Sequence, residues 1–595
     1  MLVVDMHVKS LVQPVIRHRL EPARSEAMQS SRVDTTDEEE NSPSGLHAKD
    51  GKRMRRTAKR NTPVAPARGS KRTHRKGGVA VPATRARCGS QKDPKPSRLD
   101  TTSDGDSSDA HADKDTDHDK DATGFGVRAS SRSAPDSSSV SDYTRWVIDC
   151  VLTDAERRRA GQVSHATELR VGSMCAGMGT EEIVLSALSD AFCPHGSKVR
   201  WQSTFKAELD KKKMDFLLRH FGSATTLFVF DNADLQAMHV KDATGQQRDG
   251  RPQVDVLTCG IVCKDISGLN NKGKTERSVI GKSGSALHGF LSYIQCSPFD
   301  KRPTVVILEC VARLGHHRQV DPDARAGTTY IQDELAKLGY AGDWANVDAK
   351  KFYLPQSRPR VYGLFLKMKS DRLSEECREA RQRDVKAAMQ LIRRMQPQAP
   401  PECLRSVLSR TPPIIHASSE SAASPMNPSW ENTEWPEGGP KWPQAHAKYV
   451  KEKGLAATAS QNYADFFAAA SQAKLKPRAI EATWLRLLTM RRAGTVDISK
   501  DLFVATAGAS IDYIQVRKDM FPCVTPHMTY VISDNGKLRL ASGFDALAVQ
   551  GVQSRELATH KLSSETSQSL LQDLAGNAFS ATILAAFLVA AMVVM

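Results

Sequence analysis

The chain has 595 residues, of which 39% are hydrophobic and 26% charged, and its formal net charge is +16. This length allows two or three ordinary domains with a sizeable buried core, so a chain that is disordered throughout is excluded. The 11 cysteines form no CxxC pair, and the CxxxC of Cys259 and Cys263 is not the usual zinc spacing. We therefore expect reduced cysteines in an intracellular compartment and no metal site.

The positive charge is concentrated near the amino terminus. Residues 49–98 contain 17 Lys or Arg and two Asp, so this segment carries nearly all of the net charge. Residues 1–140 also have few large apolar side chains, which predicts a disordered tail with basic and acidic runs. The basic clusters Lys52–Arg56 and Lys71–Lys76 indicate an arm that binds nucleic acid or a nuclear import signal, with a merely solvated tail as the alternative.

The two ends of the chain carry no clear membrane signal. Asp5, His7 and Lys9 interrupt the first apolar residues, which argues against a signal peptide. Residues 581–595 are apolar apart from Thr582, but a membrane span needs about 20 residues. We therefore expect a buried terminal helix rather than a membrane anchor.

Ordered structure is predicted from about residue 141, where short apolar runs alternate with helical patterns. Strands are expected at Leu169–Met174, Trp201–Ala207, Thr226–Phe230, Val254–Thr258, Thr304–Glu309 and Val361–Leu366. Helices are expected after Thr180, taken as an N-cap, at Lys211–His220 and at Thr329–Leu338. This alternation predicts a doubly wound, mostly parallel α/β sheet, which binds ligands at the carboxyl ends of its strands.

The first three strands end in residues that are suited to a cofactor. A glycine-rich loop, Gly172–Gly179, precedes a helix, and glycine lets the backbone approach a ligand closely. Its spacing is not GxGxxG, so a dinucleotide is less favoured. Glu208 ends the second strand, where a carboxylate accepts hydrogen bonds from ribose hydroxyls, and Asp234-Leu235 follows the third, in position to meet an adenine ring. The series indicates an adenosine-containing cofactor.

The later strands carry groups that are suited to catalysis. Cys263 follows the fourth strand, where its thiolate would be a nucleophile, although a lone cysteine is more often a small core residue. Glu309 ends an apolar strand, where burial should raise its pKa and make it a proton donor; an acid that simply reaches water is the alternative. Arg358 and Arg360 point to the same side of an extended segment, unless they are ordinary solvated arginines.

Two segments remain. Residues 369 to about 515 interrupt the alternation of strands and helices with clustered prolines and tryptophans, which indicates an inserted region. Its aromatic side chains are expected to pack in a core, with stacking on bases as the alternative. Gly576–Ser580 opens the apolar terminal helix and could be a plain turn and cap.

Taken in this order, the segments resemble the motifs of the cytosine carbon-5 DNA methyltransferase family over roughly residues 168 to 595. The matching segments are Gly172–Gly179, Ala207–Asp210, Asp234-Leu235, Gly260–Ser267, Glu309, Gln356–Arg360, Gly543–Val552 and Gly576–Ala578. Of these, Gln356–Arg360 fits the family's Gln-x-Arg-x-Arg pattern fully. The resemblance implies a Rossmann-like methyltransferase sheet with a catalytic core at 141–368, a target recognition region at 369–520 and the rest of the core at 521–595.

The same resemblance implies transfer of a methyl group from S-adenosylmethionine to carbon 5 of cytosine in double-stranded DNA. Carbon 5 is not nucleophilic, so the Cys263 thiolate would first add to carbon 6. Glu309 would then act at ring nitrogen 3, and Arg360 would stabilise charge at the exocyclic oxygen with Arg358 close by. The target base must leave the stacked duplex, so base flipping is implied. We expect a nuclear location and no membrane partner.

The implied cofactor site and the departures from the family complete the prediction. The cofactor-binding residues would be Ser173, Cys175, Ala176, Gly177, Met178, Gly179, Glu208, Leu209, Asp234, Leu235, Gly260 and Asn577. The family usually has Pro-Cys-Gln and Glu-Asn-Val, whereas this chain has Val262-Cys263-Lys264 and Glu309-Cys310-Val311, and it has Cys175 where a Phe is common. Two alternatives stay open: the same chemistry on RNA, and a non-catalytic nucleic-acid-binding protein that retains the fold.

Overall fold

The computed structural model describes residues 133–166, 168–261, 282–315, 327–371, 374–412, 428–431, 440–456, 463–471, 475–508, 510–562 and 566–595. The strands are β1 (Leu169–Met174), β2 (Trp201–Ala207), β3 (Leu227–Val229), β4 (His239–Lys241), β5 (Gln247–Asp249), β6 (Val256–Gly260), β7 (Val305–Val311), β8 (Tyr340–Asp348), β9 (Pro359–Lys367), β10 (Phe503–Ala507), β11 (Val516–Lys518), β12 (Thr529–Asp534) and β13 (Lys537–Leu540).

The α-helices are α1 (Val140–Trp146), α2 (Asp154–Ala166), α3 (Thr180–Phe192), α4 (Lys211–Phe221), α5 (Lys282–Cys296), α6 (Gly327–Lys337), α7 (Glu375–Arg394), α8 (Leu404–Ser409), α9 (Trp442–Glu452), α11 (Tyr463–Ser471), α12 (Pro477–Arg492), α13 (Gly543–Ala548), α14 (Ser554–Thr559), α15 (Gln568–Asn577) and α16 (Ala581–Val594). The short 3-10 helices include η3 (Asn232–Gln236) and η7 (Ser429–Glu431).

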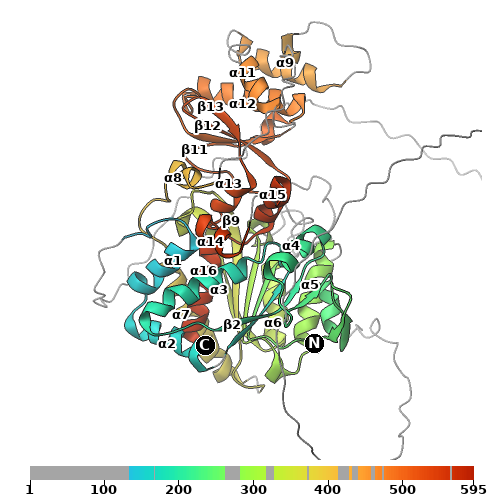
Figure 1. Ribbon diagram of the computed structural model, residues 1–595, viewed down its shortest axis with the longest axis vertical. Coiled ribbons are helices and arrows are strands. Elements are labelled where there is room, and N and C mark those ends of the chain that lie inside the picture. The colour runs from blue at the N-terminus through green and yellow to red at the C-terminus, as the bar shows by residue number, and fades with distance from the viewer. Residues whose placement is uncertain are drawn as a thin grey trace, which may run out of the picture. The chain divides into compact units, whose positions relative to one another are not determined.

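A seven-stranded sheet with the order β3-β2-β1-β6-β7-β9-β8 forms the centre of the fold (Figure 1). The five strands from β3 to β7 are parallel, and β9 runs antiparallel to both of its neighbours. The predicted doubly wound, mostly parallel α/β sheet is confirmed. The chain leaves β1 toward β2 and later returns to β6 on the other side of β1. The carboxyl ends of β1 and β6 therefore flank the position where such sheets bind ligands.

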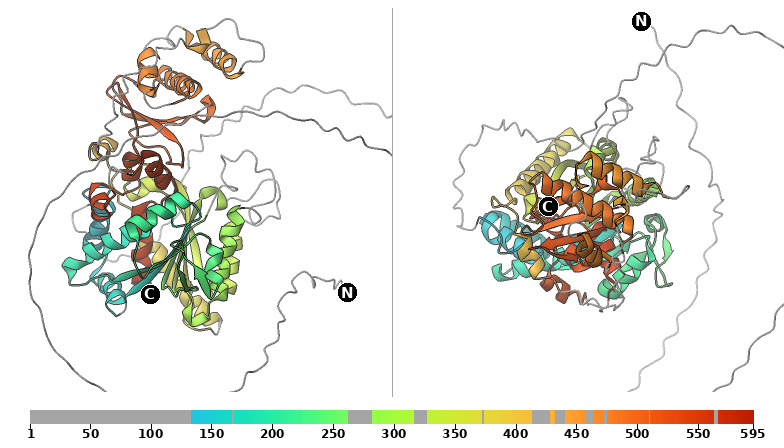
Figure 2. Two further views of the ribbon diagram at one scale, coloured as in Figure 1. Left: turned by 45° about the vertical axis from the view of Figure 1, so that its right-hand side comes forward. Right: turned by 90° about the horizontal axis from the view of Figure 1, so that it is seen from above.

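Two hydrophobic clusters cover the two faces of this sheet. Successive residues of β7 alternate between them, with Val305 and Ile307 in the first cluster and Val306 and Leu308 in the second. The first cluster includes α3, α7 and α16, whereas α5 and α6 belong to the second. Figure 2 shows the sheet between these two layers of helices. The near-continuous apolar sequence of β7 follows from its burial on both faces.

The terminal helix α16 lies inside the first cluster and is buried over nearly its whole length, as expected from its apolar sequence. It packs against α2, α3 and α7. Among the described residues, no single helix has both the length and the apolar character needed to cross a membrane. The pair α15 and α16, bent by 41° between them, passes that test together by length and composition.

The predicted insertion contains both a helical part and a second sheet. Four antiparallel strands in the order β11-β10-β12-β13 have one face packed against α11 and α12 in a third cluster, which is formed by residues between Val450 and Val531. The other face joins the first cluster through Val504, Tyr530 and Ile532. Of the three clustered tryptophans behind the packing expectation, Trp430 packs against this cluster, Trp442 stacks edge-on against His446, and Trp435 lies outside the described residues.

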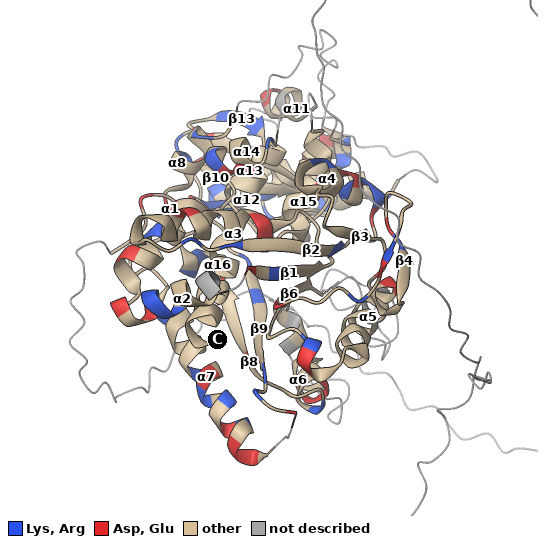
Figure 3. Ribbon diagram, turned by 60° about the horizontal axis from the view of Figure 1, so that its bottom comes forward, with Lys and Arg blue, Asp and Glu red and all other residues tan. Residues whose placement is uncertain are grey.

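The preceding helices α7 and α8 belong to the first cluster rather than to this third one. The exposed side of α7 carries alternating acidic and basic residues (Figure 3), and the buried Arg381 donates to the carbonyl of Lys367 at the end of β9. The start of the third cluster therefore does not coincide with residue 369. The division into 141–368, 369–520 and 521–595 stays a prediction.

Three local expectations are corrected by the structure. The N-cap of α3 is Gly179, in a left-handed conformation, and Thr180 is the first helical residue. Glu309 does not end its strand, because pairing with β9 continues as far as Val311. Packed structure begins before residue 141: Ser138 is fully buried and its backbone N–H donates to the Glu402 carboxylate at 2.6 Å. The predicted tail otherwise lies outside the described residues.

Candidate active site

The glycine-rich loop after β1 is held by the residue that follows β2. The Glu208 carboxylate accepts hydrogen bonds from the backbone N–H of Gly177 at 2.9 Å and of Asp210 at 3.0 Å. Gly177 has φ +53°, and a Cβ there would lie 3.3 Å from the carbonyl oxygen of Asn577. The loop therefore depends on glycine for both its backbone conformation and its close approach to the segment before α16.

Asn577 and Gly260 border the same loop from two other elements. The Asn577 side chain donates to the carbonyl and the carboxylate of Asp573 within α15, at 2.7 and 3.1 Å. A Cβ at Gly260, the last residue of β6, would lie 3.6 Å from the Cys175 carbonyl oxygen and 3.9 Å from the Phe579 ring. The structure thus brings together the predicted residues of β1, β2, β6 and the 576–580 segment.

The residues after β2 and β3 lie next to each other at the carboxyl edge of the sheet. The N–H of Glu208 donates to the carbonyl of Val229 at 3.0 Å. Leu209 and Phe230, the apolar residues nearest this contact, are exposed by 72% and 37%. Asp234 accepts from the N–H of Asp231 in a capping box that begins η3. An apolar surface and two carboxylates are therefore available where the sequence predicted an adenine ring and a ribose.

Several predicted cofactor residues have side chains that point into the protein. Ala176 and Met178 are in the first cluster and Leu235 is in the second, and the hydroxyl of Ser173 is buried against the hydroxyl of Thr258 at 3.2 Å. Their contacts with a ligand would have to be made by backbone atoms. The sequence motif selects these positions for their backbone conformation and packing.

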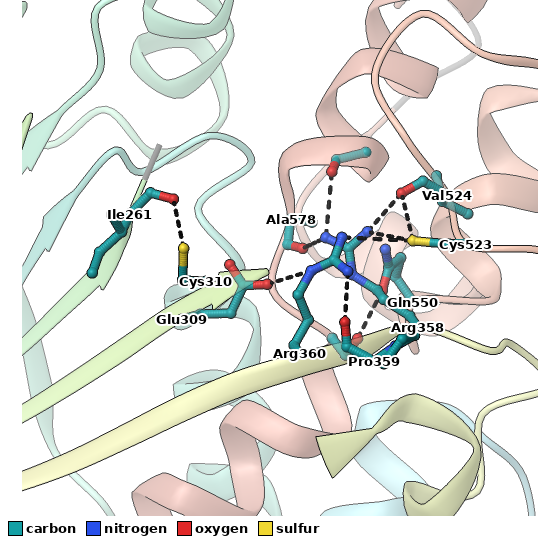
Figure 4. Close-up of polar contacts among 12 residues, drawn as sticks. Ile261, Glu309, Cys310, Arg358, Pro359, Arg360, Cys523, Val524, Gln550 and Ala578 are labelled. Atoms are coloured by element: carbon teal, nitrogen blue, oxygen red, sulfur yellow. Dashed lines mark hydrogen bonds and ion pairs between the residues drawn. The ribbon is translucent and has the colours of Figure 1, made fainter. Parts of the chain in front are cut away.

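Glu309 and Arg360 form an ion pair on neighbouring strands. The Arg360 Nε lies 2.9 Å from the Glu309 Oε1, and both side chains are 12% exposed (Figure 4). The register between β7 and β9, in which Val311 faces Arg360, places the two groups beside each other. A carboxylate and a guanidinium in contact can bind two adjacent polar atoms of one ligand, with one group able to hold a proton and the other able to stabilise negative charge.

Arg358 has a different set of partners. Its guanidinium donates to the carbonyls of Val524 at 2.6 Å, Ala578 at 3.0 Å and Gly576 at 3.3 Å, and the residue is 2% exposed. These bonds join the segment before β9 to two segments that are more than 160 residues later in the chain. The expectation of both arginines on one side is met, since each contacts the Cys523 sulfur. Arg358, however, is used to hold backbone segments together.

The segment that contains Cys523 was not predicted to take part in the site. It pairs with the arginine motif through Phe521, whose N–H donates to Pro355 and whose carbonyl accepts from Ser357. The Cys523 Sγ lies 3.6 Å from Arg360 and 3.9 Å from Arg358. No sequence signal marks this cysteine, because its relevance arises from pairing between distant segments. Phe230 is a second residue that was missed, although an aromatic at the end of an apolar strand could have indicated it.

The predicted nucleophile, Cys263, lies outside the described residues. The last described residue before Cys263 is Ile261. Its N–H donates to the Glu309 carbonyl at 2.9 Å, and its carbonyl accepts from the Cys310 thiol at 3.9 Å. The cysteine that does lie on β6, Cys259, is buried. Its hydrogen bond with Cys175, together with burial, raises the pKa of Cys259 well above the usual value. Cys259 is therefore a poor nucleophile at neutral pH.

Comparison with known proteins agrees with this geometry. Residues 169–450, from β1 into α9, match the family described as C-5 cytosine-specific DNA methylase. Over these residues the chain belongs to this family. The cysteine-bearing segment, the Glu309 strand and the arginine motif all lie inside the matched range. The family uses S-adenosylmethionine as its methyl donor.

Two curated relatives extend the similarity beyond that range. The chain is 25% identical to the DNA (cytosine-5-)-methyltransferase DMT5 of Cryptococcus neoformans var. grubii over 442 residues, which is 71% of this chain and 17% of the relative. It is 23% identical to DMT5 of Verticillium dahliae over 478 residues, 70% of this chain and 19% of the relative. The chain thus spans less than a fifth of the length of either relative.

A solved structure, the Dnmt2 methyltransferase of S. pombe, matches with 12% identity and a TM-score of 0.34, covering 70% of this chain and 96% of that one.

Of the residues that depart from the usual family motifs, Val262 and Lys264 lie outside the described residues. Cys310 replaces the usual Asn and is buried against Ile261. Cys175, in place of the usual Phe, has φ +53° and accepts a weak hydrogen bond from the Asn232 side chain at 3.8 Å.

The residues present fit S-adenosylmethionine. A carboxylate has about four acceptor positions, so Glu208 can accept from ribose hydroxyls as well as from its two backbone donors. The exposed Leu209 and Phe230 offer an apolar surface for the adenine ring. Gly177 permits the close approach between the loop and Asn577 that would bring backbone groups next to the methionine part.

Proposed function

We propose that this chain methylates carbon 5 of cytosine in double-stranded DNA. The observation that carries the proposal is the Glu309–Arg360 ion pair, which lies beside the end of β6, where the chain continues toward Cys263. In cytosine, ring nitrogen 3 and the exocyclic oxygen are adjacent. Contacting carboxyl and guanidinium groups match this pair of atoms. The candidate cofactor site lies at the carboxyl ends of the neighbouring parallel strands of the same sheet.

The chemistry follows from the electronic structure of cytosine. The thiolate of Cys263 adds to carbon 6, and the electron pair of the carbon 5–carbon 6 double bond moves toward the ring nitrogen and oxygen. Glu309 supplies a proton or hydrogen bond at nitrogen 3, and Arg360 stabilises the charge that develops at the oxygen. S-adenosylmethionine, when bound, supplies the methyl group to carbon 5. The proton of carbon 5 then leaves to a base, and the double bond re-forms as the cysteine is expelled.

The reaction requires the base to be turned out of the duplex, because carbons 5 and 6 are otherwise stacked between neighbouring pairs. Arg358 and the 521–526 segment contribute by holding Arg360 in place. The recognition region and DNA contacts would offset the cost of flipping, which is a few kcal/mol.

The test uses the full chain, labelled S-adenosylmethionine, and duplex DNA in which the target cytosine is replaced by 5-fluorocytosine. Fluorine blocks loss of the carbon 5 substituent, so an active enzyme becomes covalently trapped through Cys263. We expect a labelled protein–DNA adduct with the wild-type chain and none with Cys263→Ala. The matched control is Cys296→Ala, at the exposed end of α5, which should form the adduct normally.

Other outcomes are equally informative. Full methylation by Cys263→Ala would show that the nucleophile is assigned wrongly. An adduct with 5-fluorocytosine RNA but not with DNA would replace the proposed substrate by RNA. DNA binding without methylation or adduct would support a non-catalytic protein that retains the fold.

The basic amino-terminal segment provides a second substrate contact in this proposal. Residues 49–98 carry most of the net charge, and each phosphate that they neutralise adds to the salt dependence of DNA binding. A chain that starts at residue 133 should bind duplex DNA more weakly and with a shallower slope of log affinity against log salt. Equal affinity and slope would exclude this role.

We also propose that the clusters Lys52–Arg56 and Lys71–Lys76 direct the protein to the nucleus. A fluorescent fusion of the full chain should be nuclear, and replacement of both clusters by Gln should redistribute it. An unchanged distribution after that replacement would contradict the proposal.

A further inference from the structure

A buried ion cluster borders the glycine-rich loop. Lys206, on β2, is paired with Glu181 and Glu182, which lie in the first turn of α3. The distance from the Lys206 Nζ to the Glu182 Oε1 is 3.0 Å, and the side chains of all three residues are at most 9% exposed. One cation is shared by two carboxylates, and the positive end of the α3 dipole partly compensates the second negative charge.

The same strand holds the loop at its other end. Lys206 and Glu208 are two residues apart at the carboxyl end of β2, so both side chains lie on one face. Glu208 accepts from the N–H of Gly177, and Lys206 binds the carboxylates of Glu181 and Glu182. The segment 177–182, which joins the loop to α3, is therefore clamped to β2 at both ends.

The start of α3 has no side-chain cap of its own. Its N-cap is Gly179, which has φ +74° and forms no side-chain capping bond. A Cβ at Gly179 would lie 2.9 Å from the Phe221 ring, so a capping side chain could not be added without displacing that ring. The Lys206 ammonium lies 5.4 Å from the centre of the same ring. The ion cluster therefore fixes the first turn of α3 to β2 at a position where no side chain caps the helix.

The positive charge of Lys206 is maintained in the folded protein. Burial by itself would lower the pKa of Lys206, but Glu181 and Glu182 outweigh that effect and raise the pKa above its usual value. Buried ion pairs are poor stabilisers, because apolar side chains of similar volume often do as well or better. A buried triad beside a ligand-binding loop is therefore better explained by the geometry that it imposes than by stability.

We propose that Lys206 is a positioning residue for the cofactor, holding the segment 177–182 in the conformation that binds S-adenosylmethionine. The inference rests on the proposed function, because it takes this loop as the cofactor site. Lys206 does not touch the cofactor. It determines where α3 begins, and with it the backbone N–H groups that face the ligand.

The test separates positioning from stability. Replacing Lys206 alone would leave two buried carboxylates without a cation, which is strongly destabilising. The variant used is therefore the neutral triple change Lys206→Met, Glu181→Gln and Glu182→Gln. The matched control is the neutral double change Arg170→Gln and Asp255→Asn, which removes an ion pair at the opposite end of β1.

The melting temperature of the full chain checks that each variant is folded. Two readouts of positioning are then measured without DNA: the Kd of S-adenosylmethionine by calorimetry, and amide hydrogen exchange of residues 176–182. The triple variant should melt at a temperature similar to that of the wild type but bind about tenfold more weakly, since it loses hydrogen bonds from a charged donor. Its loop amides should exchange faster. The control should change neither readout.

Wild-type binding distinguishes the two levels of the inference. If the wild-type chain does not bind S-adenosylmethionine, the proposed function fails. If it does bind, and the triple variant binds as tightly with unchanged exchange, the positioning role of Lys206 is overturned. Should the triple variant not fold, Glu182→Gln alone provides the test, with an expected weakening of about threefold and faster exchange. Unchanged values in that variant would also overturn the inference.

Discussion

Replacing Arg358 by Met should destabilise the protein, whereas the same change at Arg360 should remove activity. Arg358 donates to three backbone carbonyls and is almost fully buried. Arg360 forms an ion pair with Glu309 and also donates to the carbonyl of Pro359 at 2.8 Å. The two arginines of one motif are therefore predicted to fail in different ways.

The magnitude for Arg358→Met follows from the carbonyls that lose their donor. Each buried acceptor left unpaired costs about 1–3 kcal/mol. We use the lower value because Arg358→Met also removes the cost of burying a charged guanidinium, which offsets part of the loss. The three carbonyls together then give about 3 kcal/mol. A cooperative unit of about 460 residues has an unfolding entropy of about 1 kcal/mol/K, so the melting temperature should fall by about 3 °C.

The assay is thermal unfolding of both variants together with methyl transfer at saturating cofactor. Arg360→Met leaves the Glu309 carboxylate without its cation and should also melt below the wild type, but it should lose about 100-fold or more in rate at temperatures where it is folded, as for other single charge-stabilising donors. Arg358→Lys is the control that retains the charge but not the three-way geometry. Arg358→Met with an unchanged melting temperature, or Arg360→Met with near-normal turnover, would refute this division of roles.

The other predictions concern pH, backbone packing and the recognition region. Burial lowers the pKa of His560 below its usual value, so the unfolded chain binds more protons than the folded chain as the pH falls through about 6.5. The melting temperature should therefore decrease from pH 7 to 5.5, and it should decrease less in His560→Asn. Gly576→Ala should be severely destabilised, because its Cβ would lie 2.2 Å from the backbone nitrogen of Pro526. Gly196→Ala, in open space at φ +69°, should cost only about 1 kcal/mol, and equal melting temperatures of the two variants would contradict this difference. Glu481→Ala removes the acceptor for the Ser429 N–H and hydroxyl and should speed hydrogen exchange in η7 and α12 without changing the cofactor Kd; unchanged exchange would argue against this anchor.

Much of the central fold could be predicted from local pattern. The bounds of β1 and β2 agree with the expected strands, and α4 and α6 differ from the expected helices by at most two residues at either end. These elements have clear periodicity and strong end signals, such as Asp210, which caps α4 by accepting from two backbone N–H groups. The N-cap of α3 was missed because Gly179 starts the helix through its left-handed backbone, whereas Thr180 has the side chain typical of a cap.

The candidate site could be predicted in its members but not in their contacts. The spacing of Gly177, Glu208, Glu309 and Arg360 identified groups that the structure brings to one edge of the sheet. The separate use of Arg358 was not visible, because two arginines one residue apart in an extended segment look equivalent. The contribution of Cys523 was also invisible, since it depends on the pairing of Phe521 with the arginine motif.

The sequence by itself determined which chemical groups this protein has and in which order its strands present them, because residue type and periodicity are local properties. The tertiary structure decided which of these groups meet. Arg358 binds carbonyls 166 to 220 residues away, and Lys206 finds its carboxylates on a helix that precedes it by 25 residues. Such contacts depend on how sheet and helices pack around a shared core, and the free energy of that packing is spread over many apolar residues that no single motif records.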